Sequence, residues 1–349
     1  MNKAGSDLSM PRVSWRAAYR LRLKRKRLLW RAFRARHQLH PVQLRLRTFA
    51  PDAVIVVTVL RNERSRLPYF LDYYRKLGAA HFLMIDNGSA DGSAAYLQTQ
   101  QDVSVWQCTA GYRAARFGLD WSTWLQRKYC HDRWSLTVDV DELLVFDSCA
   151  QKGLPDLTRW LDQQGIQGFG AMMLDLYPKG RLSHQIYQPG QDPTEVLDWF
   201  DTGPYRAERQ APLGNLWLQG GARERVFFAD RPERSPTLNK IPLVKWDRAY
   251  AYVNSTHSIL PRDLNAIYDG PGTSQPSGVL LHTKFLPEIV SKSETEKARQ
   301  QHFHTPSDFD GYYVQLMAAP DLWQPQSQKY TGPSQLVDLG LMSRIAWRD

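Results

Sequence analysis

The pattern of apolar and polar positions in the first half of the chain predicts alternating strands and helices. Residues 53–60 form a run of mostly β-branched apolar residues, which is typical of a strand buried on both faces. Residues 67–77 then place apolar side chains at helical spacing, and Gly78 follows where a helix C-cap belongs. Two more strands and one more helix follow, at residues 81–86, 103–107 and 93–100. This order predicts an α/β fold with a parallel sheet.

Residues 134–146 stand out because three carboxylates interrupt an apolar stretch that we interpret as one buried strand. These carboxylates belong to Asp139, Asp141 and Glu142. An unpaired buried charge costs several kcal/mol, so the stretch predicts a bound cation or a basic neighbour. Oxygen ligands in an Asp-x-Asp pattern suit Mg²⁺ or Mn²⁺, which complete their coordination with water and substrate phosphates. The alternative is that these carboxylates only mark the polar end of a strand, where the chain continues into a loop.

Two further polar clusters, at residues 61–64 and 86–89, follow predicted strands. Ligands of open α/β sheets bind beyond the carboxyl ends of the strands, so we expect both clusters to lie near residues 139–142. A short carboxylate such as Glu63 or Asp86 can accept a hydrogen bond from a ribose hydroxyl or a base imide. Each of these two clusters alone is more typical of a turn than of a site, but the three together favour a nucleotide site.

Composition adds limits on the class of protein. With 349 residues and 42% hydrophobic content, the chain can bury one large core or two modest ones. Its three cysteines show no metal-ligand or disulfide-framework spacing, so we expect neither a zinc site nor disulfides, and a reducing compartment. No apolar stretch reaches the length of a membrane span, and no secretion signal is recognised.

The net charge of +10 is concentrated near the N-terminus, where residues 8–51 contain 13 Lys and Arg and no acid. We expect residues 1–50 to form a basic helical arm, distinct from a body at residues 51–349. Its aromatic and leucine residues gather loosely on one helical side, which favours an anionic membrane surface as partner of residues 11–47. A solvated or partner-binding arm is the alternative. A nucleic-acid arm is least favoured, because no recognisable nucleic-acid fold follows.

Four segments together resemble the GT-A glycosyltransferases, in particular the family-2-like group of bacterial polysaccharide assembly. The matching segments are residues 57–63, 85–93, 121–129 and 138–142. The resemblance implies a Rossmann-like, mostly parallel sheet with helices on both faces, divided into a nucleotide-binding half (51–147) and an acceptor-side half (148–349). It also implies that Asn62, Glu63 and Asp86 hold the nucleoside, while Asp139 and Asp141 bind the metal ion and the diphosphate.

The second half offers further candidates through the same resemblance. Residues 278–285 resemble a late His-x-Lys element, so His282 would be the last metal ligand and Lys284 would neutralise the leaving diphosphate. Residues 220–227 and 238–246 resemble acceptor-side segments, and Glu224 is the candidate general base of an inverting transfer. The alternatives are a structural histidine and a surface Arg-Glu-Arg ladder.

These expectations combine into one hypothesis and two alternatives. The hypothesis is a cytoplasmic glycosyltransferase at the inner membrane face, which uses Mn²⁺ or Mg²⁺ to move a sugar, from UDP-sugar by preference, to a saccharide or glycolipid acceptor in cell-surface polysaccharide or glycolipid synthesis. A nucleotidyltransferase is one alternative, although the glycine-rich loop expected of it is missing from residues 61–66. The other is a non-catalytic protein that binds membrane or nucleic acid through its basic arm.

Overall fold

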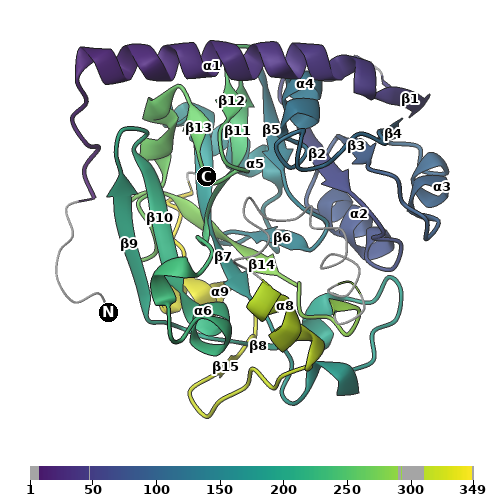
Figure 1. Cartoon of the computed structure of the whole chain (residues 1–349), viewed down its shortest axis with the longest axis vertical. Coiled ribbons are helices and arrows are strands. Elements are labelled where there is room, and N and C mark those ends of the chain that lie inside the picture. The colour runs from purple at the N-terminus through teal and green to yellow at the C-terminus, as the bar shows by residue number, and fades with distance from the viewer. Residues whose placement is uncertain (1–7, 47, 290–291, 293–309, 348–349) are drawn as a thin grey trace.

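A computed structural model describes residues 8–46, 48–289, 292 and 310–347, and its centre is a nine-stranded mixed sheet (Figure 1). The strand order across the sheet is β1-β4-β3-β2-β5-β11-β7-β14-β6. The strands in this order are β1 (His40–Gln43), β4 (Val103–Gln107), β3 (His81–Asp86), β2 (Val54–Leu60), β5 (Arg133–Thr137), β11 (Asn239–Trp246), β7 (Gly168–Asp175), β14 (Ser277–His282) and β6 (Glu142–Val145).

Most strands of this sheet point in one direction. The pairs β2-β3, β3-β4, β2-β5 and β7-β14 are parallel, whereas β1, β11 and β6 run antiparallel to their neighbours. Six strands therefore place their carboxyl ends at the same edge, where ligands of such sheets bind. The expected α/β class with a mostly parallel sheet is confirmed.

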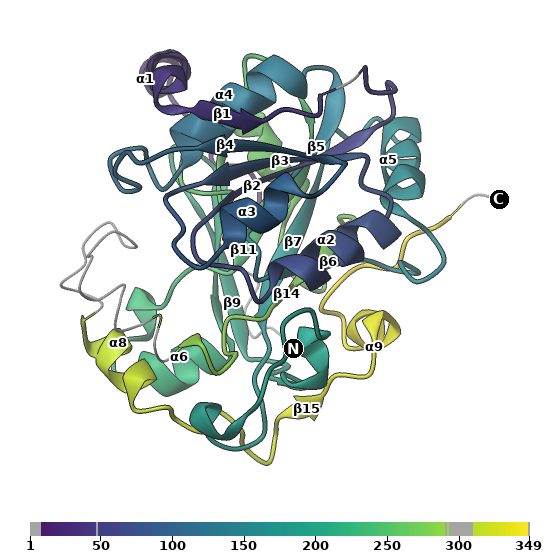
Figure 2. The ribbon, with the colours of Figure 1, turned by 90° about the vertical axis from the view of Figure 1, so that its right-hand side faces the viewer.

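Helices cover both faces of the sheet (Figure 2). Alternate residues of β2 point to opposite faces. Val54 and Val56 pack in the same core as α2 (Leu67–Lys76) and α5 (Leu154–Gln163). Ile55 and Val57 pack instead with α4 (Leu119–Tyr129). Burial on both faces explains why this strand has an uninterrupted apolar sequence.

The local sequence patterns of the first half predicted most of its helices and strands, with boundaries within two residues of the observed ones. The strands expected at 81–86 and 103–107 match β3 and β4, and α3 (Ser93–Gln98) matches the short helix expected between them. Helix α2 ends before Gly78, whose φ of 94° is the left-handed conformation that glycine adopts without strain.

The interpretation of residues 134–146 as one strand is wrong. Strand β5 ends at Thr137 beside β2, and β6 begins at Glu142 on the far edge of the sheet beside β14. Residues 138–141 cross between these two positions. A continuous strand would place Asp139 and Asp141 on one face, under an apolar helical layer. The break moves them to the end of the sheet, where charged partners are available.

The N-terminal segment, for which we expect a helical arm distinct from the body, contains one helix and one strand that both contact the body. Helix α1 (Trp15–Ala35) buries Leu21, Leu28 and Ala32, and Arg31 forms an ion pair with Asp120 of α4. Strand β1 then pairs with β4 as the edge of the sheet. Arg47, one of the cations of the expected arm, lies outside the described residues.

The remaining elements complete the molecule, most of them in a smaller layer around β7 and β14, whereas β12 and β13 lie beside α1 and α4 (Figure 1). They are β8 (Trp199–Phe200), β9 (Tyr205–Gln210), β10 (Asn215–Gly220), α6 (Gly221–Phe227), β12 (Ala251–Tyr252), β13 (Ile259–Leu260), α8 (Asp310–Met317), β15 (Gln328–Lys329) and α9 (Pro333–Asp338). Short 3₁₀ turns lie at Arg36–Gln38, Leu182–His184, Pro193–Glu195, Pro232–Arg234 and Arg262–Ile267.

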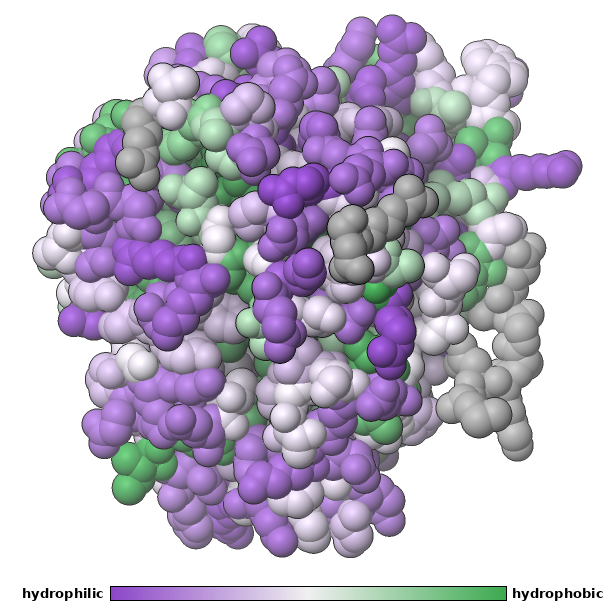
Figure 3. All heavy atoms as spheres, turned by 180° about the vertical axis from the view of Figure 1, so that it is seen from behind, coloured by the Kyte–Doolittle hydropathy of each residue, from purple (hydrophilic) through white to green (hydrophobic). Residues whose placement is uncertain are grey.

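The distribution of hydrophobic residues on the surface is consistent with this layered fold. Seen from behind, it is largely hydrophilic, with hydrophobic side chains in small separate patches (Figure 3). No helix among the described residues is long and apolar enough to cross a membrane.

We expect Asp120→Asn to lower the free energy of unfolding by about 2 kcal/mol, because the change leaves Arg116 and Arg31 without their common counter-ion. The Asp120 side chain is 4% exposed, and its carboxylate lies 2.8 Å from Arg116 Nε and 2.9 Å from one terminal nitrogen of Arg31. Urea unfolding measures the loss. Asp72→Asn, in an ion pair whose side chains are 53% and 77% exposed, is the control and should change stability by less than about 0.5 kcal/mol. Equal losses in both variants would contradict this role of Asp120.

Candidate active site

A cluster of acidic and basic side chains lies where the 138–141 crossing meets the ends of β7, β14 and α6 and the start of β11. We call it the carboxylate cluster, and its members are Asp139, Asp141, Glu142, Asp175, Arg223, Lys240 and His282. The 138–141 crossing and the elements β6, β7, α6, β11 and β14 all contribute to it. This convergence at one end of the sheet is the position expected of a ligand site.

His282 is the centre of one half of the cluster. Its Nδ1 lies 2.6 Å from Asp175 Oδ1, and its Nε2 lies 3.4 Å from Asp141 Oδ2. An Nδ1–H that donates to Asp175 leaves Nε2 directed at Asp141. Arg223 holds Asp175 from the other side, with its Nε 3.1 Å from Oδ2 and a terminal nitrogen 2.5 Å from Oδ1. The buried ion pair thus fixes the orientation of the imidazole.

The pKa values of these groups follow from their mutual contacts. Burial alone would raise the pKa of Asp175, but Arg223 and His282 hold it below its ordinary value. Burial likewise opposes ionisation of Asp141, and the adjacent His282 more than offsets this effect, so the pKa of Asp141 is also lowered. Burial would lower the pKa of His282, yet Asp141 and Asp175 raise it. Both carboxylates are therefore ionised at neutral pH.

Asp141 and His282 are suited to hold one divalent cation. A separation of 3.4 Å between Oδ2 and Nε2 is compatible with two ligands about 2.1 Å from a common ion. The side chain of Asp141 is 26% exposed, so an ion can reach it from solvent. A hydrogen bond from the other imidazole nitrogen to a carboxylate, here Asp175, is the usual support of a metal-bound histidine. The nitrogen ligand favours Mn²⁺ over the harder Mg²⁺.

Asp139 does not join this pair, contrary to its expected role as a metal ligand. Its side chain is 55% exposed, and Oδ2 lies 3.7 Å from Lys240 Nζ. Lys240 forms a closer ion pair of 2.9 Å with Glu142, and both of these side chains are buried. Partial burial and repulsion from Glu142 raise the pKa of Asp139 to about 7. Asp139 is therefore a polar group at the mouth of the site, and Glu142 is the counter-ion of Lys240.

A small cavity lies beside Asp139 and Lys240. It encloses about 50 Å³ between the ends of β2 and β5, and Tyr112, Phe117 and Thr256 contribute to its walls. This volume holds a few water molecules. A larger ligand would therefore lie across its opening, in contact with Asp139.

The three expected nucleoside ligands lie on two loops that hydrogen-bond to each other. Asp86 is fully buried, and its Oδ1 has no hydrogen-bond partner among the described residues. Asn62 has a φ of 54°, and its Oδ1 accepts a 2.8 Å hydrogen bond from the backbone of Ala90, so it connects the loops. Glu63 pairs with Arg66 at 2.9 Å and with Lys292 at 2.8 Å. Of the three, Asp86 is the one with an unused acceptor.

The two expected catalytic residues have different surroundings. Lys284 is half-buried, and its charge contributes to the lowered pKa of Asp141, so it belongs to the site electrostatically. Glu224 faces away from the cluster: one carboxylate oxygen pairs with Arg206, and the other accepts a 2.6 Å hydrogen bond from Ser235 Oγ. Its proposed role as general base stays a prediction that these contacts disfavour.

Sequence reasoning missed Asp175, Arg223 and Lys240 as members of the site. Asp175 ends the fully buried strand β7, and Lys240 lies near the start of the almost fully buried strand β11. A single charged residue near the end of a long apolar strand was the available signal. Arg223 gave a weaker signal, because the next charged residue along the chain, Glu224, was chosen as the candidate general base instead.

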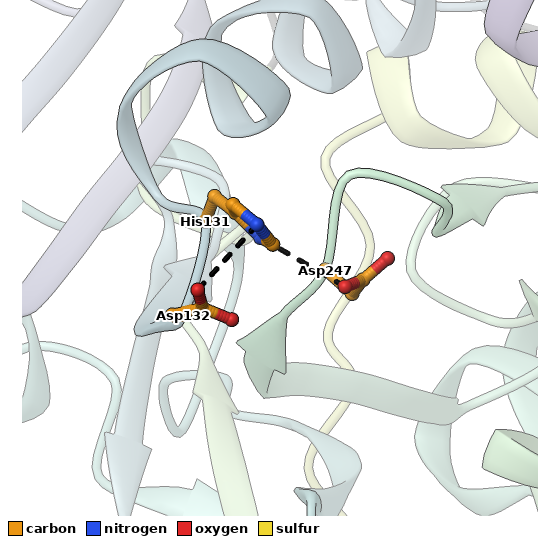
Figure 4. Close-up of side chains that lie close together, drawn as sticks. All are labelled: His131, Asp132 and Asp247. Atoms are coloured by element: carbon orange, nitrogen blue, oxygen red, sulfur yellow. Dashed lines mark ion pairs between the residues drawn. The ribbon is translucent and has the colours of Figure 1, made fainter.

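A second group of possible metal ligands lies at the other end of β5, formed by His131, Asp132 and Asp247 (Figure 4). Asp132 faces Nε2 of the imidazole at 3.4 Å, whereas Asp247 faces Nδ1 at 3.8 Å. One ligand atom from each residue lies within 4.8 Å of the others, but the two carboxylates approach different nitrogens of the ring. We assign no role to this group.

Comparison with known proteins adds little to this description. No protein-family model and no curated protein matches the chain. Among solved structures, one match is to the crystal structure of 4-diphosphocytidyl-2C-methyl-D-erythritol synthase, with 13% identity and a TM-score of 0.24. The match covers 40% of this chain and 66% of that one, just under two thirds of its length. The site must therefore be judged from its own geometry.

We expect Asp175→Asn to weaken Mn²⁺ binding about 10- to 100-fold, because the amide no longer provides the charged acceptor that orients His282. Calorimetric titration of the full chain with Mn²⁺ measures the change. Asp338→Asn is the matched control, since that carboxylate is 71% exposed and pairs with Arg344 on the surface. If both variants keep the affinity of the parent protein, Asp175 does not support a metal ligand.

A second prediction concerns acid stability and His257, which lies beside Lys240. Burial and the charges of Lys240 and Arg223 lower its pKa to about 3, and its Nδ1 lies 2.5 Å from the carbonyl oxygen of Asn239. Between pH 6.5 and pH 3 the unfolded chain binds a proton there that the folded chain does not, so stability falls as pH falls through this window. By pH 5 we expect the free energy of unfolding to fall by about 1 kcal/mol, a figure that already allows for the residual exposure of the ring.

Urea unfolding at pH 7 and pH 5 tests this assignment. His257→Gln should show a smaller loss than the parent protein, whereas the exposed His184→Gln should show the same loss. A parent-like loss in His257→Gln would contradict a depressed pKa at His257.

Proposed function

We propose that this protein is a metal-dependent glycosyltransferase that moves a sugar from a nucleotide-diphosphate sugar to a saccharide acceptor. The observation that supports this most directly is the alignment of Asp141, His282 and Asp175. It provides two ligands for a divalent ion and a group that orients one of them. Two protein ligands leave positions for the oxygens of a diphosphate, which Mn²⁺ and Mg²⁺ commonly take from a substrate.

The ion, when bound, would neutralise charge on the departing nucleoside diphosphate. Lys284 is placed to add a second positive charge near the same group, and Arg66, buried beside Glu63, adds a third. Asp139 can accept hydrogen bonds from donor hydroxyls at the mouth of the site. Most of the rate enhancement would come from positioning and charge.

The rest of the hypothesis concerns the setting of this reaction. We propose UDP-sugar as the donor and a saccharide or glycolipid acceptor, in cell-surface polysaccharide or glycolipid synthesis. The cytoplasmic face of a membrane is the location that suits such an acceptor. The basic segment at residues 11–47 supports this placement through its charge.

Two other functions remain as alternatives. A nucleotidyltransferase could use the same acidic residues, but residues 61–66 lack the glycines of a phosphate-binding loop. Its product would be pyrophosphate, whereas glycosyl transfer releases a nucleoside diphosphate. A non-catalytic binding protein would need neither the buried Asp175–His282 pair nor a partly exposed Asp141. Deleting residues 1–50 would not test this alternative, because it would also remove β1 from the sheet.

We expect the parent protein to bind one class of nucleotide sugar in the presence of Mn²⁺ and Asp141→Asn to lose that binding at least about 10-fold. Calorimetry with UDP-sugars and GDP-sugars, with and without Mn²⁺, measures this. Turnover should fall at least about 100-fold in the same variant, because the change weakens stabilisation of the leaving group. Asp338→Asn is again the control for loss of a carboxylate.

The identity of the products decides between the enzymes. Release of nucleoside diphosphate with an acceptor present supports glycosyl transfer, and release of pyrophosphate from a nucleoside triphosphate supports nucleotidyl transfer. No binding of any sugar nucleotide at millimolar concentration would overturn the proposal.

A further inference from the structure

Helix α1 has two apolar sides: the inner one packs against the rest of the protein, and the outer one is largely exposed, although its last member, Phe33, contacts Trp124 of α4. The inner side buries Leu21, Leu28, Ala32 and Ala35. The outer side holds five large apolar residues in solvent, which we call the outer stripe. They are Trp15 (74% exposed), Tyr19 (55%), Leu23 (47%), Trp30 (58%) and Phe33 (37%).

The outer stripe runs along one side of the helix. With about 100° of rotation per residue, its five members fall within an arc of about 80°, opposite the buried residues. Lys26 lies within the same arc. A helix that packs on one side only normally presents polar residues to water, so this second apolar side is not required by the fold.

Positive charge surrounds the outer stripe. The exposed cations of α1 are Arg16, Arg20, Arg22, Lys24, Lys26, Arg27 and Arg34. Arg31 forms the ion pair that attaches the helix to Asp120. No acidic residue occurs from residue 8 to residue 51, so the exposed cations have no counter-ion on their own segment.

The charge of the chain is divided sharply between this segment and the body. The first 50 residues hold 14 of the 45 Lys and Arg but one of the 35 Asp and Glu, so residues 51–349 carry a net charge of −3. The whole positive excess of the protein therefore resides in the N-terminal segment. Such a surface attracts an extended anionic partner.

The helix is also held firmly in place. Besides the ion pair with Asp120, Arg31 donates a 2.7 Å hydrogen bond to the carbonyl of Ala114, and Arg127 donates to the carbonyl of Leu29. Figure 1 shows α1 lying along one edge of the molecule, and Figure 2 shows it end-on at a corner. The outer stripe is thus presented without any change in the fold.

We propose that α1 binds an anionic lipid surface, with the outer stripe inserted at the level of the lipid headgroups. Trp and Tyr favour this interface because each has an apolar body and a polar tip. Arg and Lys beside the stripe reach anionic headgroups while their methylene stems lie along the apolar layer. An apolar groove on another protein would cover the outer stripe, but it would leave the cations beside the stripe without counter-ions. The proposal does not depend on the reaction catalysed.

Co-sedimentation of the full chain with vesicles tests this proposal. We expect binding to phosphatidylcholine vesicles that contain about 30 mol% phosphatidylglycerol, and at least about 10-fold weaker binding to pure phosphatidylcholine. Trp15→Ser/Trp30→Ser should weaken binding at least about 10-fold through lost apolar burial. Arg16→Gln/Arg20→Gln/Lys26→Gln should weaken it about 100-fold, because each cation near the surface contributes about a factor of five.

Matched controls separate the helix from general surface effects. Ile186→Ser removes an apolar side chain that is 76% exposed elsewhere, and it should leave vesicle binding unchanged. Lys76→Gln/Arg159→Gln/Arg344→Gln removes the same number of exposed charges from other elements, and it too should bind like the parent protein. Unfolding midpoints of all variants show whether each one is folded.

Three results would overturn the proposal. One is equal binding to neutral and anionic vesicles. Another is equal loss in the control variants. The third is a concentration-dependent dimer that Trp15→Ser/Trp30→Ser abolishes while vesicle binding is absent, since the outer stripe would then be an interface between two copies of the chain.

Discussion

The buried carboxylate of Asp175 is the group on which the candidate site depends. It ends the apolar strand β7, where an uncompensated charge would cost several kcal/mol. Arg223 and His282 both contact it, and they come from α6 and β14. Satisfying this one charge therefore draws a helix and a strand to the same point, and it leaves the second nitrogen of His282 facing Asp141.

The strand order explains why these groups can meet. Strand β14 runs parallel to β7 and antiparallel to β6, and in this register His282 pairs with Asp175 on one side and Glu142 on the other. Strand β11 enters antiparallel between β5 and β7 and brings Lys240 to Glu142. Since β11 and β7 separate β5 from β14 and β6, the chain must cross the end of the sheet at residues 138–141. That crossing places Asp139 and Asp141 over the ends of the strands.

Local patterns in the sequence predicted the structural features that depend on residues close together in the chain. The strands and helices of residues 54–107 and the stop at Gly78 follow from periodicity and backbone preference. The resemblance assigned Asp139, Asp141 and His282 to one metal ion, and the structure brings the last two together but not Asp139. The break at 138–141 was missed because apolar flanks look the same whether one strand or two contain them. Lys240 and Asp175 were missed because their roles come from contacts with residues far away in the sequence. Glu224 was chosen by type, yet its orientation depends on Arg206 and Ser235, which no local pattern indicates.

The same electrostatic constraint explains why the carboxylate cluster and the outside of α1 differ. In the carboxylate cluster each buried charge has an opposite charge close to it, because the low-dielectric interior penalises any imbalance. On the outside of α1 water screens the charges, so an excess of cations can persist beside exposed aromatic rings without a partner in the fold. Such a surface lowers the solubility of a protein rather than its stability. An unbalanced, apolar exterior on a helix that is already docked is therefore better explained by a partner outside the chain than by the folding of the chain itself.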